Sequence, residues 1–279
     1  MQTTVGIIGN GFVGGAVANG LKSFADIRIY DALKERSTHH YNDVIFSDFI
    51  FVCLPTPMVD VEGGKCNLSI VEEFFSTLPS ICEGIFVIKS TVPIGTTKKL
   101  SDKYPHLKII HNPEFLTAAN ANEDFINADR TVIGGEEEWV SRIIPLYENF
   151  KNTPILTMKS TESECVKYFA NCFLATKLMV FNEMKMLCNE IEEVDYSSLM
   201  NGVISDNRIG NSHYDAPGED GEYGFGGTCF PKDINSLIYT MEKHGVDPLV
   251  LKSVWEQNKN YRKLWDWAEN SSAVMSEKQ

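Results

Sequence analysis

The sequence lacks the patterns that mark secreted, metal-binding and membrane proteins. Its seven cysteines form no C-x-x-C pair and no zinc-ligand spacing, and their odd number argues against a disulfide framework. Its six histidines show no metal-site pattern either. No apolar stretch reaches the roughly 20 residues that span a bilayer, and Met1–Thr4 lead into a strand without a basic, apolar leader. These absences predict a cytoplasmic protein with no metal ion and no membrane partner.

Positive charge is also scarce. The chain has 25 Lys and Arg residues against 38 Asp and Glu residues, a net charge of −13. This balance argues against nucleic acid or an anionic membrane as the main partner, and a nucleotide ligand would need a local cationic pocket. At 279 residues, without internal repeats or low-complexity tracts, the chain has room for one large or two modest domains.

The N-terminus carries the pattern of a dinucleotide-binding turn. A β-branched strand over residues 3–8 precedes a G-x-G-x-x-G turn, and residues 16–24 read as a helix, an order that directs backbone N–H groups at a pyrophosphate. A second strand, 27–30, ends at Asp31, where a carboxylate binds ribose hydroxyls and repels a 2′-phosphate. The sequence therefore predicts NAD as cofactor, although Lys34 and Arg36 leave NADP open. The expected cofactor-binding residues of this segment are Gly9, Gly11, Phe12, Val13, Gly14 and Asp31.

The first half of the chain alternates strands with helices. Further strands are expected at 49–54, 85–89, 108–111, 131–133 and 154–157, and helices at 69–78, 96–103 and 137–150. The strands are short apolar runs rich in β-branched residues, as is typical of buried parallel strands. This alternation predicts an α/β, Rossmann-like, doubly wound parallel sheet over residues 1–160.

The hydrophobic period changes at Thr161. The run Thr161-Glu162-Ser163-Glu164 matches a capping box, and apolar residues then recur at helical spacing to about Ile191, a helix of roughly 45 Å. Helices at 196–201, 231–244 and 248–268 follow, while 205–227 reads as a long loop. We therefore expect a helical second domain over residues 161–279 that begins with a long helix.

One segment near the C-terminus combines glycines with a cysteine, Gly224-Phe225-Gly226-Gly227-Thr228-Cys229-Phe230-Pro231-Lys232-Asp233. Pro231 suits the first turn of a helix, so Cys229 would precede the helix N-terminus, where the dipole favours a thiolate. A buried cysteine beside a tight turn is the alternative for an isolated Cys-Gly pair. The ten-residue string is more specific, and it resembles the catalytic-cysteine loop of the UDP-glucose/GDP-mannose dehydrogenase family.

Other segments resemble the same family at its spacing. They are Leu54–Pro57, Lys89–Thr96, Asn112–Leu116, Lys167–Asn171 and Phe181–Glu183. The first three follow predicted strands, which is the ligand-binding side of an open parallel sheet. Lys167 and Asn171 project from one helix face, and the neighbouring Phe169 and Phe173 indicate a partly buried helix in which the lysine needs a partner.

The resemblance implies a four-electron oxidation of a nucleotide-sugar primary alcohol. Cys229 would add to the aldehyde and yield a thioester, while Lys167 and Asn171 hold the oxyanion. Asp233 would orient Lys167 and a water, and Glu114, through a water held by Thr91, would act as the base of hydrolysis. The resemblance further implies cofactor contacts from Pro55, Thr56 and Thr91, and substrate contacts from Phe115, Leu116, Arg208, Tyr214 and Gly226.

Two departures separate the chain from the family pattern. First, Ala118 stands where a second acid is common in the family. Second, family members usually continue past Asn258-Lys259-Asn260 into a nucleotide-binding third domain, and we expect this chain to be a short form that lacks that domain. Two alternatives stay open, a two-electron hydroxyacid dehydrogenase and a non-catalytic NAD-binding partner subunit. Because the long helix carries apolar residues around it, we also expect a homodimer in which Arg208 or nearby loop residues reach the partner's active site.

Overall fold

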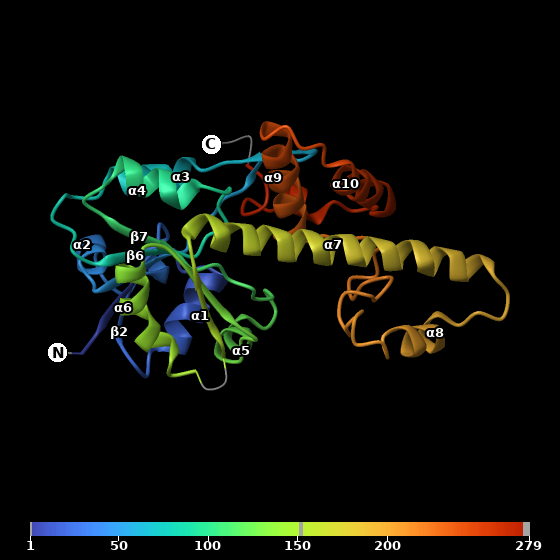
Figure 1. Cartoon of the computed structure of the whole chain (residues 1–279), viewed down its shortest axis with the longest axis horizontal. Coiled ribbons are helices and arrows are strands. Elements are labelled where there is room, and N and C mark those ends of the chain that lie inside the picture. Colours follow the sequence, from blue (N-terminus) through green and yellow to red (C-terminus); the bar gives the residue numbers. More distant parts are fainter. Residues whose placement is uncertain (1, 151–152, 276–279) are drawn as a thin grey trace. The chain divides into compact units, whose positions relative to one another are not determined.

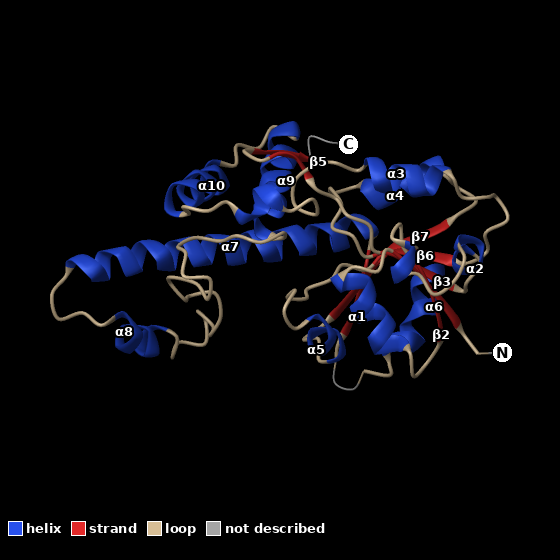
Figure 2. Cartoon of the chain, turned by 180° about the vertical axis from the view of Figure 1, so that it is seen from behind, coloured by secondary structure: helices blue, strands red, loops and turns tan. Residues whose placement is uncertain are grey.

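The computed structural model describes residues 2–150 and 153–275, and the chain divides into two compact units (Figures 1 and 2). Unit 1 contains residues 1–56 and 68–167, and unit 2 contains residues 57–67 and 168–279. The division therefore falls within the long helix rather than before residue 161, and residues 57–67 belong to the second unit. Met1 and Gln279, the ends of the expected domains, lie outside the described residues.

Unit 1 is built on a seven-stranded sheet in the order β2-β1-β3-β6-β7-β8-β9. The strands are β1 (Thr4–Ile8), β2 (Asp26–Tyr30), β3 (Phe49–Val52), β6 (Ile85–Ile88), β7 (Lys108–His111), β8 (Thr131–Gly134) and β9 (Ile155–Met158). All neighbouring pairs are parallel except β7 and β8, so the expectation of a parallel β8 is wrong. The predicted Rossmann-like, doubly wound class is confirmed, and it places the glycine turn after β1 at the switch point of the sheet.

Helices cover both faces of this sheet. On one face α1 (Phe12–Leu21), α5 (Ala121–Ile126) and α6 (Glu137–Tyr147) pack around Val17, Phe125 and Ile143. On the other face α2 (Tyr41–Ile45), α3 (Ser69–Ser76) and α4 (Thr96–Lys103) pack around Val44, Phe75 and Leu100. The buried strands between them carry near-continuous apolar runs because both of their faces are covered.

The long helix α7 (Ser160–Glu190) forms as expected, but its predicted capping box does not. Glu162 accepts a hydrogen bond from the Lys159 amide at 2.8 Å. Glu164 is buried and instead accepts from the Thr97 amide and hydroxyl, at 2.8 and 2.6 Å, in the first turn of α4. The sequence spacing identified a helix-capping carboxylate but assigned it to the wrong helix, because the capped amides come from a distant segment.

Unit 2 combines helices with a hairpin from the first half of the chain. Its elements are β4 (Met58–Asp60), β5 (Gly63–Cys66), α7 from Tyr168 onward, α8 (Tyr196–Val203), α9 (Phe230–Lys243), α10 (Leu249–Tyr261) and a 3-10 turn η2 (Asp266–Glu269). The indole N–H groups of Trp255 and Trp267 donate to hairpin carbonyls at 2.8 and 3.1 Å. The expected helix to residue 268 stops earlier, since Arg262 turns to extended backbone. Among the described residues, no helix has the length and apolar character of a membrane span.

Candidate active site

The glycine turn between β1 and α1 is shaped so that only glycine fits at two of its positions. Gly9 has a φ of +92°, and a Cβ at Gly14 would lie 2.0 Å from the Gly9 carbonyl oxygen. Gly11 precedes α1 directly, and a Cβ there would have no atom within 4 Å. The turn is therefore tight on its inner side and open at the helix N-terminus, the arrangement that admits a pyrophosphate.

Asp31 lies beside this turn at the end of β2. Its Oδ2 accepts a hydrogen bond from the Asn10 amide at 2.6 Å, and its Oδ1 accepts from the Leu33 amide at 2.8 Å. The carboxylate is thus fixed next to the glycine turn, where the sequence analysis expects it to bind a ribose. The residues of this segment fit NAD. Lys34 and Arg36 follow in a short 3-10 turn.

The loops after β3 and β6 are joined by side-chain hydrogen bonds. The Thr56 hydroxyl donates to the Thr91 carbonyl at 2.7 Å, and the Ser90 hydroxyl donates to the Leu54 carbonyl at 2.6 Å. Thr56 and Thr91 are buried, whereas Pro55 is exposed. The structure therefore brings these three expected cofactor residues together at the carboxyl edge of the sheet.

A buried ion pair connects the loop after β7 to α7. The Lys167 ammonium donates to Glu114 Oε1 at 3.0 Å and to the Glu114 carbonyl at 2.6 Å, while Glu114 Oε2 accepts from the Leu116 amide at 2.7 Å. Lys167 is buried as expected, but not because of its aromatic neighbours. Phe169 and Phe173 are 59% and 67% exposed, since two residues along a helix turn the side chain by about 200° to the opposite face.

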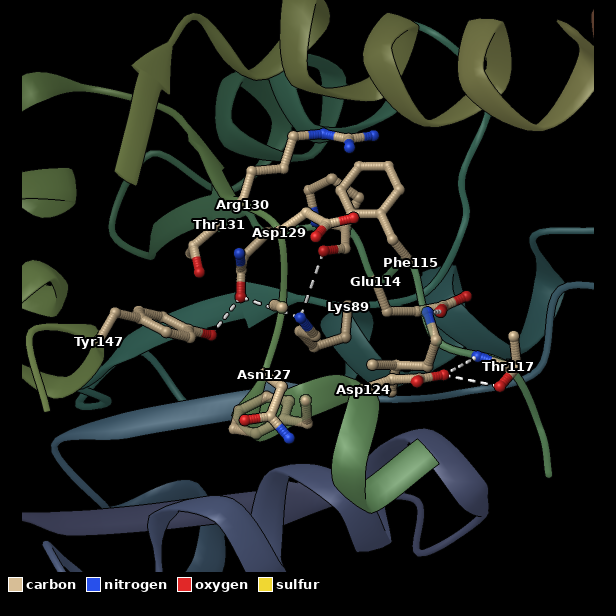
Figure 3. A pocket seen from close by; sticks show the side chains of 15 residues that line it. Lys89, Glu114, Phe115, Thr117, Asp124, Asn127, Asp129, Arg130, Thr131 and Tyr147 are labelled. Carbon is tan, nitrogen blue, oxygen red and sulfur yellow. Dashed lines mark hydrogen bonds between the residues drawn. The ribbon is translucent and has the colours of Figure 1, made fainter. Parts of the chain in front are cut away.

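Lys89 forms a second buried cluster below the same loop (Figure 3). Its ammonium donates to Asn112 Oδ1 at 3.0 Å and to the Pro113 carbonyl at 3.3 Å, and the Tyr147 hydroxyl also donates to Asn112 Oδ1. Burial lowers the pKa of Lys89 to about 8, and it lowers the pKa of His111, the last residue of β7, to about 3. The sequence analysis gave Lys89 no role, although a lysine directly after four apolar strand residues signals a buried cation.

In unit 2, Cys229 is the N-cap residue of α9, with Pro231 in the first turn. Asp233 is buried, and its carboxylate accepts from the Asn171 amide at 2.6 Å and the Lys232 ammonium at 2.5 Å. Burial alone would lower the pKa of Lys232, but the negative charges of Asp233 and Cys229 outweigh it and raise that pKa. The ion-pair partner of Asp233 is thus Lys232, which the sequence analysis left without a role, whereas Lys167 pairs with Glu114.

Polar side chains hold the glycine loop before Cys229. The Gly224 amide donates to Asn182 Oδ1 at 2.9 Å, and the Phe225 amide donates to Asn258 Oδ1 at 2.7 Å. The Gly227 amide donates to an Asp266 carboxylate oxygen at 2.8 Å. These contacts fix the backbone that presents the thiol, and they give Asn182, Asn258 and Asp266 a supporting role that the motif spacing alone does not predict.

The remaining expected substrate residues lie in different surroundings. Arg208 is highly exposed and forms an ion pair with Asp206 at 2.6 Å. The Tyr214 carbonyl accepts from the Tyr196 hydroxyl at 2.6 Å. A Cβ at Gly226 would lie 2.3 Å from Asp266 Oδ1, so a side chain there would require the Asp266 side chain to shift. Within residues 2–150 and 153–275, no group of three His, Cys, Asp or Glu side chains is arranged to hold a metal ion.

Comparison with known proteins matches most of the chain to one family. Residues 29–151 match the NAD binding domain of the UDP-glucose/GDP-mannose dehydrogenase family, and residues 161–260 match its central domain. UDP-glucose 6-dehydrogenase of Pseudomonas aeruginosa is 34% identical over 235 residues, which cover 78% of this chain and 50% of that protein. UDP-glucose 6-dehydrogenase TuaD of Bacillus subtilis is 33% identical over 225 residues, covering 77% and 47%. The chain spans about half the length of these relatives.

Solved structures show the same architecture. A UDP-glucose dehydrogenase from Pyrobaculum islandicum superposes with a TM-score of 0.81 and 28% identity, covering 93% of this chain and 68% of that one. A 3-hydroxyisobutyrate dehydrogenase of Mycobacterium tuberculosis superposes with a TM-score of 0.74 over 98% of this chain and 97% of its own. At 15% identity, this second likeness concerns the fold alone.

Proposed function

Because the chain belongs to the UDP-glucose/GDP-mannose dehydrogenase family, we propose that it oxidises the primary alcohol of a nucleotide sugar to a carboxylate with NAD. One observation carries the proposal. Cys229 is the N-cap residue of α9, in a loop whose backbone is held by Asn182, Asn258 and Asp266. A helix N-terminus and the nearby Lys232 cation both favour a thiolate, and oxidation of an alcohol only as far as an aldehyde or ketone has no use for one.

The chemistry assigned to Cys229 requires two hydride transfers. NAD bound at the Gly9–Gly14 turn supplies the hydride acceptor. The alcohol loses one hydride and one proton, and the Cys229 thiolate then adds to the aldehyde carbon to form a thiohemiacetal oxyanion. Loss of a second hydride from that carbon leaves a thioester, which water cleaves to a carboxylate and free thiolate with release of two protons. Two NAD are therefore reduced for each sugar consumed.

Several polar and charged side chains are each suited to one step. The Asn171 side-chain amide and the Lys167 ammonium are the donors proposed to stabilise the oxyanion on the reacting carbon. Glu114 is the base proposed to take the proton of the hydrolytic water, with Thr91 proposed to hold that water. Asp233 holds the Asn171 amide and the Lys232 ammonium by hydrogen bonds. This role for Asp233 replaces the expected orientation of Lys167.

The stoichiometry of NADH and sugar tests the proposal. Purified chain is incubated with UDP-glucose, GDP-mannose or UDP-N-acetylmannosamine, and NADH and sugar acid are quantified by absorbance and mass spectrometry. We expect two NADH per sugar consumed with one of the three. A ratio of one, with an aldehyde or ketone product, would favour the two-electron alternative. NAD binding without turnover of any sugar would favour a non-catalytic partner subunit.

A homodimer forms part of the same proposal and is supported by the exposed side of α7. Phe169, Phe173, Met184 and Leu187 are exposed large apolar side chains on this helix, whereas Phe181 is buried within unit 2. Exposed apolar residues at helical spacing are typical of a helix that packs against another chain. Light scattering at micromolar concentration should give twice the chain mass. A Phe173→Glu variant should give the monomer mass, and a monomeric wild type would contradict the proposal.

A further inference from the structure

A pocket of about 330 Å³ opens beside the Asn112–Leu116 loop of unit 1 (Figure 3). Its lining includes Lys89, Phe115 and Arg130. Arg130 directly precedes β8, and β8 runs antiparallel to β7. The start of β8 therefore lies at the same sheet edge as the ends of β6 and β7. This direction of one strand brings Arg130 to the edge at which parallel sheets bind their ligands.

The Arg130 guanidinium stacks on the Phe115 ring, with 4.3 Å between the guanidinium carbon and the ring centroid. Within the part of the chain that the structure describes, no hydrogen bond or ion pair engages its N–H groups. The contact with the ring uses none of the guanidinium N–H donors, so they remain available to an acceptor. Phe115 therefore lies against a cation whose hydrogen-bonding groups are not used by the described part of the protein.

Two of the acidic residues lining the pocket are already bound by protein groups. Glu114 pairs with Lys167, and the Asp124 carboxylate accepts from the amide and hydroxyl of Thr117 at 2.7 and 2.6 Å. The third acid, Asp129, is exposed. Lys89, which also lines the pocket, has two hydrogen-bond acceptors for the three donors of its ammonium. The pocket thus offers an anion a planar donor at Arg130 and a second cation at Lys89.

We infer that Arg130 and this pocket bind the diphosphate of the nucleotide sugar, an inference that rests on the proposed function. A guanidinium recognises phosphate oxygens through paired hydrogen bonds, which are stronger than those between neutral groups. The proposed reaction has two ligands with a diphosphate. The diphosphate of NAD has its own site at the Gly9–Gly14 turn, so the sugar nucleotide is the ligand left for Arg130.

Binding measurements without turnover test this site. Inorganic pyrophosphate, UDP-glucose and NAD are titrated calorimetrically into the whole chain and into Arg130→Met. We expect pyrophosphate and UDP-glucose to bind about tenfold more weakly to the variant, and NAD affinity to change less than about twofold. Lys108→Met is the matched control. The Lys108 ammonium also lies over an aromatic ring of unit 1, 5.2 Å from the centroid of Trp139, but Lys108 does not line the pocket. It should leave all three affinities unchanged.

Other outcomes separate this inference from the proposed function. Pyrophosphate binding that is absent in the wild type, or equal in wild type and Arg130→Met, would overturn the diphosphate site. If Arg130→Met weakened the binding of NAD alone, the diphosphate site would also be overturned, since the pocket would then belong to the cofactor. If Arg130→Met does not fold, Arg130→Lys replaces it in the experiment. This variant should still bind pyrophosphate more weakly than the wild type, since lysine lacks the paired donors. Arg130-dependent pyrophosphate binding without sugar oxidation would refute the reaction and leave the site standing.

Discussion

The Lys167 ammonium lies 3.0 Å from Glu114 Oε1, and both side chains are almost completely removed from solvent. Lys167 also donates to the backbone carbonyl of Glu114, so the lysine holds both the side chain and the main chain of one loop residue. In a buried pair of this kind each charge is stabilised mainly by its partner, because neither side chain has water to solvate it. The same contact therefore concerns both the stability of unit 1 and the proposed chemistry.

Replacing only one partner of the Lys167–Glu114 pair should destabilise the fold. We expect Lys167→Met to lower the free energy of unfolding by about 3 kcal/mol, because it leaves the Glu114 carboxylate buried and without its cation. The double variant Lys167→Met/Glu114→Gln should recover at least about 1 kcal/mol relative to the sum of the single changes. Urea denaturation measures all three. Lys98→Met, which breaks the exposed pair with Asp102, is the control and should cost less than about 1 kcal/mol. Strict additivity in the cycle would contradict the prediction.

Replacing the candidate nucleophile should stop acid formation and spare the cofactor. Cys229→Ser replaces the thiolate with a neutral hydroxyl, which is a much weaker nucleophile near neutral pH. We expect sugar-acid production to fall by at least about 100-fold, with NAD affinity within about twofold of wild type. Mass spectrometry of the product and calorimetry check the two halves. Cys165→Ser, at a thiol that is also half-buried and whose pKa is raised by burial, should behave as wild type. Undiminished acid from Cys229→Ser would exclude the thioester route.

The Asp31 carboxylate should make NAD the better cofactor. Its place beside the Asn10 amide puts a negative charge where a 2′-phosphate would lie. The wild type should bind NAD at least about tenfold more tightly than NADP, a difference of about 1.4 kcal/mol. Asp31→Ser should narrow this preference by removing the repulsion. Fluorescence titration with the two reduced cofactors gives both ratios, and equal affinities in the wild type would refute the assignment.

Lys89 should make the stability of unit 1 depend on pH. Burial lowers its pKa to about 8 from an ordinary value of 10.5, so between these values the unfolded chain binds more protons than the folded one. The contribution of Lys89 to stability therefore rises as pH rises through this window. Between about pH 7 and about pH 9.5, the wild type should gain about 2 kcal/mol relative to Lys89→Met. Urea unfolding of both proteins at both pH values measures the difference. If the free energy of unfolding changed equally with pH in the wild type and in Lys89→Met, Lys89 would not be the titrating group.

Local sequence patterns predicted the strands of the main sheet and most of the longer helices, but not α2, α5 or the β4–β5 hairpin. The expected bounds of β7 and α4 coincide with those in the structure, since each is a short segment with one clear period. Long-range relationships were harder to predict. The direction of β8 depends on its neighbours in the sheet, and the Glu164 carboxylate caps α4 through contacts 67 residues away in the sequence. No periodicity in a single segment encodes either relationship.

The residues of the candidate site likewise include some that local motifs indicate and others whose place depends on long-range packing. Motifs were sufficient to propose Cys229, Lys167 and Glu114, because these residues belong to distinctive strings, and their roles remain predictions. They did not indicate Arg130, whose place at the ligand-binding edge follows from the reversed direction of β8, or Lys232, whose pairing with Asp233 depends on burial in the first turn of α9. A charged residue at a strand end or in a first helical turn is common, and only the surrounding packing shows that its charge is held in place.

The β4–β5 hairpin constrains when unit 2 can fold during synthesis. Val61 in its turn accepts a hydrogen bond from Trp267, and Asn67 directly after it donates one to Met275, partners that lie 206 and 208 positions later in the sequence. A ribosome therefore releases the hairpin long before the segment that completes its surroundings has been synthesised. Until then its strand edges have no partner in the nascent chain, and they are open to pairing with other chains. Folding of unit 2 is consequently a late event of translation, and it depends on the last segment of the chain that the structure describes.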